Sequence, residues 1–270
     1  MINVAINGAS GRMGRSIMTI LMGENDMVLT GALEMPGHPT LGSPARAEPG
    51  SSGEAPEEIL ITDDPKKALE GASVLIDFST PEGTIAAIQA AADAGVAAVT
   101  GTTGLTDDDI SLVMEASTSI PVVMAPNMSV GVNLLFKIAG EVAAVLGNDY
   151  DVEIIEAHHR QKVDAPSGTA KRLYEIIARA LERDAGEVGV YGREGMVGKR
   201  TTDEIGVMAV RAGDIVGEHT VLFGGIGERI ELVHKLHSRM TLASGAVRAA
   251  RWIIGQQPGK YDMQDVLGLT

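Results

Sequence analysis

The fold is decided at the start of the chain, by the run INVAINGASGRMG at residues 2–14. A short apolar stretch, typical of a buried strand, leads into three glycines, and a helical pattern follows them. We expect Gly8 to allow a tight turn, Gly11 to let the backbone approach a pyrophosphate, and Gly14 to let the helix pack close to the sheet. The N–H groups at the start of the helix would then bind the pyrophosphate of a dinucleotide.

An acidic residue follows this turn at the distance that a dinucleotide site needs. Glu34 ends the second strand pattern, 20 residues after Gly14, where a carboxylate can accept hydrogen bonds from an adenosine ribose. The competing interpretation is a glycine-rich turn that binds no ligand. The candidate cofactor-binding residues of this region are Gly8, Ala9, Ser10, Gly11, Arg12, Met13 and Glu34.

The first half of the chain alternates strand patterns with helical patterns. Strands are expected at 2–6, 28–33, 74–78, 97–100 and 121–125, and helices at 11–22, 81–94 and 106–117. Nearly continuous apolar strands separated by helices are typical of a parallel sheet covered on both faces. The fold class is therefore α/β, with a Rossmann-type doubly wound parallel sheet.

Further candidate residues stand where other strands of this sheet end, because open α/β sheets bind ligands at the carboxyl ends of their strands. Asp77-Phe78-Ser79 is one such turn, although each of these turns taken alone could be an ordinary strand end. The stretch from His38 to Glu58, rich in Pro, Gly, Ser and Glu, is expected to be a mobile surface loop. The remaining cofactor candidates are Gly101, Thr102, Thr103, Ala125, Pro126, Asn127 and Met128.

After Asn127 the pattern changes to that of an inserted α+β domain for substrate binding and oligomerisation. Helices are expected at 130–146 and 169–182, and strands of a mixed or antiparallel sheet at 151–157, 206–211, 219–223 and 229–234. A last helix at 242–254 would return to the first domain. The expected division is residues 1–127 with 240–270 as the dinucleotide-binding domain, and 128–239 as the second domain.

The composition restricts the class of protein. A net charge of −14 excludes the basic surface that nucleic-acid binding needs. There are no cysteines, so disulfides and thiolate chemistry are excluded. The chain shows no signal-peptide pattern and no stretch of about 18 uncharged apolar residues, so we expect no membrane span and a cytoplasmic location.

The strongest chemical signal is the run EAHHRQKVDAPSGTA at residues 156–170. His158, His159, Arg160 and Lys162 gather cations in an acidic protein, and such a cluster can bind a dianion and supply a proton near neutral pH. The Pro-Ser-Gly-Thr turn that follows opens a helix and offers N–H groups to a carboxylate.

Plainer interpretations apply to single members of this run. A lone histidine is more often structural, and His234 and His237 are expected to be structural or to line the pocket. Glu156 with the two histidines could suggest a metal, but the spacing matches no metal-ligand pattern, so no metal is expected.

This run resembles the signature of the dihydrodipicolinate reductase family. Other segments are similar to the same family, so the resemblance covers essentially the whole chain. These segments are residues 8–15, 77–83, 101–104, 127–133, 211–219, 238–241 and 262–267.

The resemblance implies NAD(P)H-dependent reduction of a cyclic dicarboxylate to tetrahydrodipicolinate, in the synthesis of diaminopimelate and lysine. It makes His158 the acid–base residue and Lys162 a proton donor. It further implies a homotetramer built through the sheet of the second domain. The division into two domains separately predicts closure about hinges near 127–131 and 238–241. The residues that the resemblance places on the substrate are His159, Ser167, Gly168 and Thr169.

One position departs from the family pattern and bears on the cofactor. Members that favour NADPH often carry Arg directly after the acidic residue of the second strand, and this chain has Met35 there. Because Glu34 would repel a 2′-phosphate, we expect NADH to be preferred. Arg12 stands nearby in the glycine-rich turn and can compensate for part of this repulsion, so we expect NADPH to be tolerated.

Two other functions compete with this one. One is a reductase of another small dicarboxylate, which would use the same cationic cluster. Two other types of dehydrogenase fit less well: the acylating semialdehyde dehydrogenases need a cysteine, which this chain lacks, and the homoserine-type dehydrogenases lack the His-His run that this chain has. A nicotinamide-binding redox sensor would explain the glycine-rich turn but not the cations beside an anion-binding turn.

Overall fold

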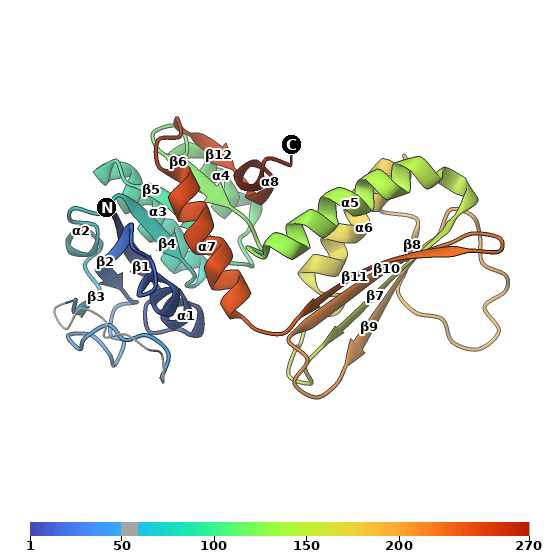
Figure 1. The fold of residues 1–270 in the computed structure, drawn as a ribbon, viewed down its shortest axis with the longest axis horizontal. Helices are drawn as coiled ribbons and strands as arrows, with labels where there is room; N and C mark the ends of the chain where they lie inside the picture. Colours follow the sequence, from blue (N-terminus) through green and yellow to red (C-terminus); the bar gives the residue numbers. More distant parts are fainter. Residues whose placement is uncertain (50–58, 270) are drawn as a thin grey trace. The chain divides into compact units, whose positions relative to one another are not determined.

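The computed structural model describes residues 1–49 and 59–269, which form two compact units (Figure 1). The first unit comprises Met1–Val130 and Arg239–Thr270, and the second comprises Gly131–Ser238. The boundaries were expected at 127/128 and 239/240. The first boundary instead falls just inside a helix that begins at Val130.

The first unit contains a seven-stranded parallel sheet in the order β12-β6-β5-β4-β1-β2-β3. The Rossmann-type sheet predicted from the sequence is therefore confirmed. Two strands at its edges were not expected, because two or three residues are too short to show a pattern. The strands are β1 (Ile2–Asn7), β2 (Met27–Leu33), β3 (Ile61–Thr62), β4 (Val74–Asp77), β5 (Ala97–Thr100), β6 (Pro121–Met124) and β12 (Gly259–Tyr261).

Helices cover both faces of this sheet, because its strands are apolar on both sides. In β1, Val4 and Ile6 face one core, while Ala5 faces the other. Side chains from three helices pack in the first core: α1 (Arg12–Leu21), α7 (Met240–Ile253) and α8 (Met263–Leu267). The second takes α2 (Pro65–Ala68), α3 (Pro81–Ala94) and α4 (Asp107–Ala116).

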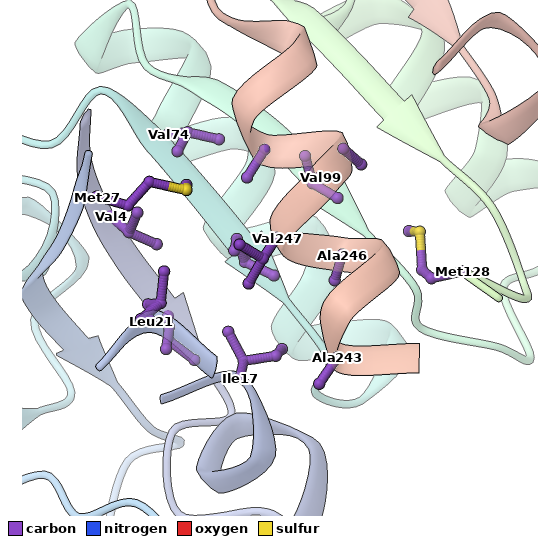
Figure 2. Close-up of a cluster of buried hydrophobic side chains, with 14 of the residues drawn as sticks. Val4, Ile17, Leu21, Met27, Val74, Val99, Met128, Ala243, Ala246 and Val247 are labelled. Atoms are coloured by element: carbon purple, nitrogen blue, oxygen red, sulfur yellow. The ribbon is translucent and has the colours of Figure 1, made fainter. Parts of the chain in front are cut away.

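The helix α7 belongs to the first unit although it follows the whole second unit in sequence. Figure 2 shows Ala243, Ala246 and Val247 on α7 beside Val99 and Ile17. Alanine side chains let the helix approach the sheet closely, and burial of the surrounding Val, Ile and Met side chains supplies about 25 cal/mol per Å² of apolar surface. The returning helix expected from the sequence is therefore present.

The segment expected to be a mobile surface loop is packed in its described part. The Ala45 N–H donates to the carbonyl oxygen of Ile59 (2.8 Å), and the Ile61 N–H donates to that of Ser43 (3.0 Å). Ala45 is only 1% exposed. Residues 38–49 therefore form the loop that was predicted, anchored by small apolar residues between the polar ones, and its mobility stays a prediction. Residues 50–58 lie outside the described part.

The second unit contains a five-stranded mixed sheet in the order β11-β10-β7-β9-β8. One face is covered by α5 (Val130–Leu146) and α6 (Gly168–Ala180), and a short 3-10 helix, η1 (Gly147–Asp149), follows α5. β7 runs parallel to β9 and antiparallel to β10, so the predicted mixed sheet is confirmed. The strands are β7 (Asp151–His158), β8 (Gly189–Val190), β9 (Ile205–Arg211), β10 (Gly217–Gly224) and β11 (Arg229–Leu236).

One helical segment, Val130–Asp149, is long and apolar enough to cross a membrane by composition alone, with a mean hydropathy of 1.6. The segment contains two charged residues, Lys137 and Glu141, whose Nζ and Oε1 atoms lie 3.6 Å apart. For that reason it is not among the uncharged apolar stretches that the sequence analysis considered. Its Phe136 and Ala139 pack in the core of the second unit, and core helices pass the same test. The segment is therefore weak evidence for a membrane span.

Candidate active site

The glycine-rich turn between β1 and α1 has the close backbone packing that its spacing predicts. Gly8 has a φ of +74°, and a Cβ there would lie 2.6 Å from the carbonyl oxygen of Phe78. A Cβ on Gly14 would lie 2.3 Å from the carbonyl oxygen of Gly8. The turn and the first turn of α1 can therefore lie this close together only without side chains at these two positions.

Most N–H groups of the turn are already used. Those of Gly8 and Ala9 donate to the carbonyl oxygen of Leu33, at 3.0 and 3.1 Å. The Ser10 N–H donates to Glu34 Oε2 (3.0 Å). No side chain caps α1, since its N-cap residue is Gly11. The N–H groups of Arg12 and Met13 are thus the ones best placed for a pyrophosphate.

A cavity of about 720 Å³ opens beside this turn, large enough for part of a dinucleotide. Glu34 lies in its wall at the end of β2, where an adenosine ribose could reach the carboxylate. Met35 also lines it, whereas Arg12 is exposed and does not. The polar and glycine residues in the wall include Asn7, Gly8, Ser10, Gly11, Glu34, His38, Ser79 and Thr80.

Asp77 connects three strand ends at this edge of the sheet. Its carboxylate is fully buried and accepts five hydrogen bonds of 2.6–3.0 Å. One of them comes from the Asn7 amide, which stands directly before the glycine-rich turn. The donors are Asn7, Ser79, Thr84, Thr100 and Thr102, from β1, the ends of β4 and β5, and α3.

The other predicted cofactor residues lie at the same carboxyl edge but outside the cavity wall. A Cβ on Gly101 would lie 2.2 Å from the Phe78 ring. Thr103 and Pro126 are exposed, while Ala125 and Met128 are buried. The Asn127 side chain accepts the Ser129 N–H (2.9 Å).

In the second unit, β7 delivers two residues of the His-His run to one place. Glu156 and His158 are two positions apart on a strand, so they share the face that α6 covers. Glu156 is fully buried, and its Oε2 lies 2.6 Å from His158 Nδ1. Arg211 from β9 donates to both oxygens of this carboxylate, at 2.8 Å each.

Their surroundings shift both pKa values. Burial raises the pKa of Glu156, but the hydrogen bonds from Arg211, His158 and the Ser167 N–H outweigh it, so the pKa lies below its usual value. Burial lowers the pKa of His158 more than Glu156 raises it. With Glu156 ionised, the shared proton resides on His158 Nδ1.

The Pro-Ser-Gly-Thr turn forms the start of α6, as its sequence predicts. The Ser167 side chain caps the helix by accepting the Ala170 N–H (3.2 Å), and the Ser167 N–H donates to Glu156 Oε1 (3.0 Å). Ser167 is 2% exposed, so its role is in the turn itself. Gly168 and Thr169 occupy the first two positions of the helix, where an anion meets the positive end of the dipole.

His219 on β10 supports the same turn and was not singled out from the sequence. Its Nε2 lies 3.1 Å from Ser167 Oγ, and its ring contacts that of His158 edge to face at 5.2 Å. Burial, followed by the charge of His158, lowers the pKa of His219 to about 3. His219 is thus neutral at physiological pH.

Unpaired polar atoms mark the surroundings as a site for a polar ligand. Within the described residues, the Nδ1 atoms of His159, His219 and His234 are buried without a hydrogen-bond partner. His234 faces His219 across β10 and β11. Buried polar groups are normally paired, so these atoms fit a site that a polar ligand or water completes.

Lys162 lies in the turn after β7, four residues beyond His158. Its Nζ donates to Asp164 Oδ1 at 2.8 Å, and its side chain is 20% exposed. This bond lowers the pKa of Asp164. In the described part of the chain no three His, Asp or Glu side chains are grouped as metal ligands.

Sequence reasoning missed the roles of Glu156, Arg211 and His219. The two-residue spacing of Glu156 and His158 on a strand was the available signal, since it puts both on one face. Arg211 and His219 come from strands more than 50 residues further along the chain, and their pairing with β7 is visible only in the fold.

Comparison with known proteins agrees with this architecture. The family profiles described as "Dihydrodipicolinate reductase, N-terminus" and "Dihydrodipicolinate reductase, C-terminus" match residues 2–128 and 131–267. The 4-hydroxy-tetrahydrodipicolinate reductase of Thiobacillus denitrificans is 51% identical over 268 residues, covering 99% of both chains. That of Geotalea uraniireducens is 48% identical over 269 residues, covering 100% of both.

A solved structure extends the match to three dimensions. The dipicolinate-bound dihydrodipicolinate reductase of a Paenisporosarcina species aligns with a TM-score of 0.75 at 25% identity, covering 98% of each chain. Profiles, relatives and structure thus agree over both units. The chain belongs to the dihydrodipicolinate reductase family.

Proposed function

We propose that this chain catalyses the NAD(P)H-dependent reduction of 4-hydroxy-tetrahydrodipicolinate to tetrahydrodipicolinate, a step in diaminopimelate and lysine synthesis. In the net reaction the ring loses water and gains one hydride and one proton. The observation that carries the proposal is the Glu156–His158 pair beside the anion-binding turn at Ser167, within a chain that belongs to this family throughout.

The second unit supplies the substrate and proton chemistry. Gly168 and Thr169 at the start of α6 bind one substrate carboxylate, and His159 contacts the substrate. His158 and Lys162 provide the proton that completes the reduction. Lys162 and the protonated form of His158 also stabilise the negative charge that develops on the substrate during hydride transfer.

The first unit holds the nicotinamide dinucleotide, which supplies the hydride when bound. Arg12 and Met13 N–H groups bind the pyrophosphate, and Glu34 binds the adenosine ribose. The missing side chains at Gly8, Gly11 and Gly14 let the backbone of the turn pack closely enough to hold these N–H groups in place. The remaining predicted residues at Gly101–Thr103 and Ala125–Met128 complete the site at the carboxyl edge of the sheet.

NADH is the preferred cofactor in this proposal, and NADPH is tolerated. A 2′-phosphate would meet the Glu34 carboxylate, which already accepts N–H groups from Ser10 and Met35 and is held in place. Met35 offers no positive charge, and Arg12 lies outside the cavity wall.

In this proposal the enzyme is cytoplasmic and assembles as a homotetramer. The face of the second unit's sheet opposite α5 and α6 has no helix on it in the described chain. It exposes Ile155 (39%), Val210 (45%) and Val233 (51%), as a sheet-to-sheet interface would require.

The proposal is tested by following oxidation of NADH and NADPH in the presence of pyruvate, aspartate semialdehyde and the synthase that joins them into the cyclic substrate. Oxidation that depends on the synthase is the expected result. Protein that binds the cofactor but oxidises it under no condition would favour the redox-sensor function. Turnover only with a different dicarboxylate would reassign the substrate.

A further inference from the structure

We propose that Glu156 is the positioning residue of this site: it fixes which ring nitrogen of His158 faces the substrate and ties His158 to the carboxylate-binding turn. The inference rests on the proposed function, in which His158 supplies a proton. It extends that function to a residue that touches neither substrate nor cofactor.

The first step concerns the tautomer of His158. Its Nδ1 lies 2.6 Å from Glu156 Oε2, so a neutral His158 carries its proton on Nδ1. Its Nε2 has no hydrogen-bond partner among the described residues. A Cβ on Gly217 would lie 3.1 Å from Nε2, so the glycine leaves that nitrogen uncovered. Nε2 is therefore the atom that exchanges a proton with a ligand.

The second step concerns distance. The same carboxylate accepts the Ser167 N–H through its other oxygen, at 3.0 Å. Glu156 thus holds the proton donor and the start of α6 on one rigid, fully buried group. A substrate whose carboxylate binds at the start of α6 would then meet His158 Nε2 at a fixed position.

The third step concerns charge. The groups that face His158 are Glu156 on its own strand, Arg211 on β9, His219 on β10 and Lys162 in the following loop. Arg211 neutralises Glu156 and also donates to the carbonyl oxygen of Asp164 (2.7 Å). Glu156 is the anion among these groups, and it alone favours protonated His158.

The test compares Glu156→Gln with Glu153→Gln. Glu153 is on the same strand and is also paired with arginines, Arg193 and Arg200, but it does not contact His158. The ¹⁵N spectrum of the histidine rings, assigned with His158→Asn, reports the tautomer and the titration of His158 without any substrate. We expect Glu156→Gln to lose the Nδ1–H tautomer and to titrate at lower pH, and Glu153→Gln to match the parent.

Kinetics provide the second readout. Since His158 acts in its protonated form, the fall of kcat with rising pH should begin at lower pH in Glu156→Gln, with kcat reduced about 10- to 100-fold near neutrality. The Kd for NADH should be unchanged. A merely structural role would lower the active fraction without moving the pH profile.

The double variant Glu156→Gln/Arg211→Met distinguishes a folding defect from the loss of the positioning role. It removes both members of the buried ion pair and so leaves no unpaired charge. It should fold and still lack the parent tautomer. A parent-like tautomer and titration in either variant would overturn the proposal. The two proposals can fail separately. If the tautomer changes in the variants but the parent itself does not reduce the cyclic substrate, the proposed function fails, while the role of Glu156 in fixing the His158 tautomer stands.

Discussion

His158 and Lys162, the two residues proposed to supply protons, have different surroundings. His158 is 9% exposed and held through Nδ1, whereas Lys162 lies in a loop and its side chain donates a hydrogen bond to Asp164. We expect His158→Ala and Lys162→Ala each to lower kcat by about 10²- to 10⁴-fold. The Kd for NADH should stay within about twofold, because the cofactor site belongs to the other unit.

Steady-state kinetics with cofactor titration by fluorescence would measure both quantities. Arg172→Ala, on an exposed position of α6, is the matched cation control and should have parent activity. Near-normal turnover in both variants would remove the two residues from the mechanism.

His219 should make the stability of the protein depend on pH. Its pKa in the folded state is about 3, below its ordinary value of 6.5. Between these values the unfolded chain binds a proton that the folded chain does not. The free energy of unfolding is therefore complete above about pH 6.5 and falls by about 1.4 kcal/mol per pH unit below it.

Denaturant unfolding of the parent and His219→Gln at several pH values between 7 and 5 checks this prediction. The variant should lose less stability on acidification than the parent. His237→Gln, at an exposed position, should keep the parent's dependence. Equal slopes for the parent and His219→Gln would contradict the buried, neutral state of this ring.

The proposed cofactor preference can be tested at one side chain beside Glu34. Met35 is 60% exposed in the wall of the cavity, so Met35→Arg can be made without disturbing the core. We expect the parent to have a higher kcat/KM with NADH, and the variant to gain about tenfold or more with NADPH, because a guanidinium pairs with a 2′-phosphate. A parent that prefers NADPH would refute the argument from Glu34.

At the level of single residues, the sequence identified side chains whose partners are local. His158, Lys162 and the Ser167 turn stand within one short run, and their types alone indicate their chemistry. It did not identify Arg211 or His219, since strand pairing between β7, β9 and β10 brings them to the site. A partner from a distant strand leaves no local pattern.

Among the secondary-structure elements, α1 depends on a missing side chain at Gly14. A Cβ on Gly14 would lie 2.3 Å from one carbonyl oxygen and 2.8 Å from the next, both of them backbone atoms that cannot rotate away. Gly14→Ala should therefore displace the start of α1, cost about 1–3 kcal/mol of unfolding free energy, and weaken NADH binding tenfold or more.

Thermal unfolding and NADH titration measure the two effects. Gly23→Ala is the control, because its Cβ would lie 3.4 Å from the nearest atom, an ordinary contact. Full NADH affinity in Gly14→Ala would show that the helix start does not need its present position to bind the cofactor.

The long elements were predictable and the short ones were not. Helices α3 and α5 begin and end where their patterns predict, and α3 is marked by Thr80 as its cap, Pro81 in its first turn and Gly95 at its end. By contrast, β3, β8, β12 and α2 have two to four residues each. The three strands exist because neighbouring strands offer them hydrogen bonds, and α2 is a single turn capped by Asp64. Segments this short carry too little periodicity of their own to indicate them.

At the scale of the whole molecule, the two units differ in how the apolar faces of their sheets are buried. The sheet of the first unit is covered by helices on both faces, whereas that of the second carries helices on one face in the described chain. A sheet face with exposed Ile and Val is incomplete by itself, since apolar surface of this kind usually marks an interface. Another copy of the chain is the partner that we propose.

A charge on that face should therefore change the particle size. Multi-angle light scattering of the parent should give four times the 28.2 kDa of one chain. Val233→Glu and Ile155→Glu would each bury carboxylates without partners in the assembled sheets, which costs several kcal/mol, so smaller particles are expected. Val145→Glu is the control, because it is 85% exposed on α5, on the opposite side of the sheet. A parent of one chain, or variants of parent size, would place the interface elsewhere or remove it.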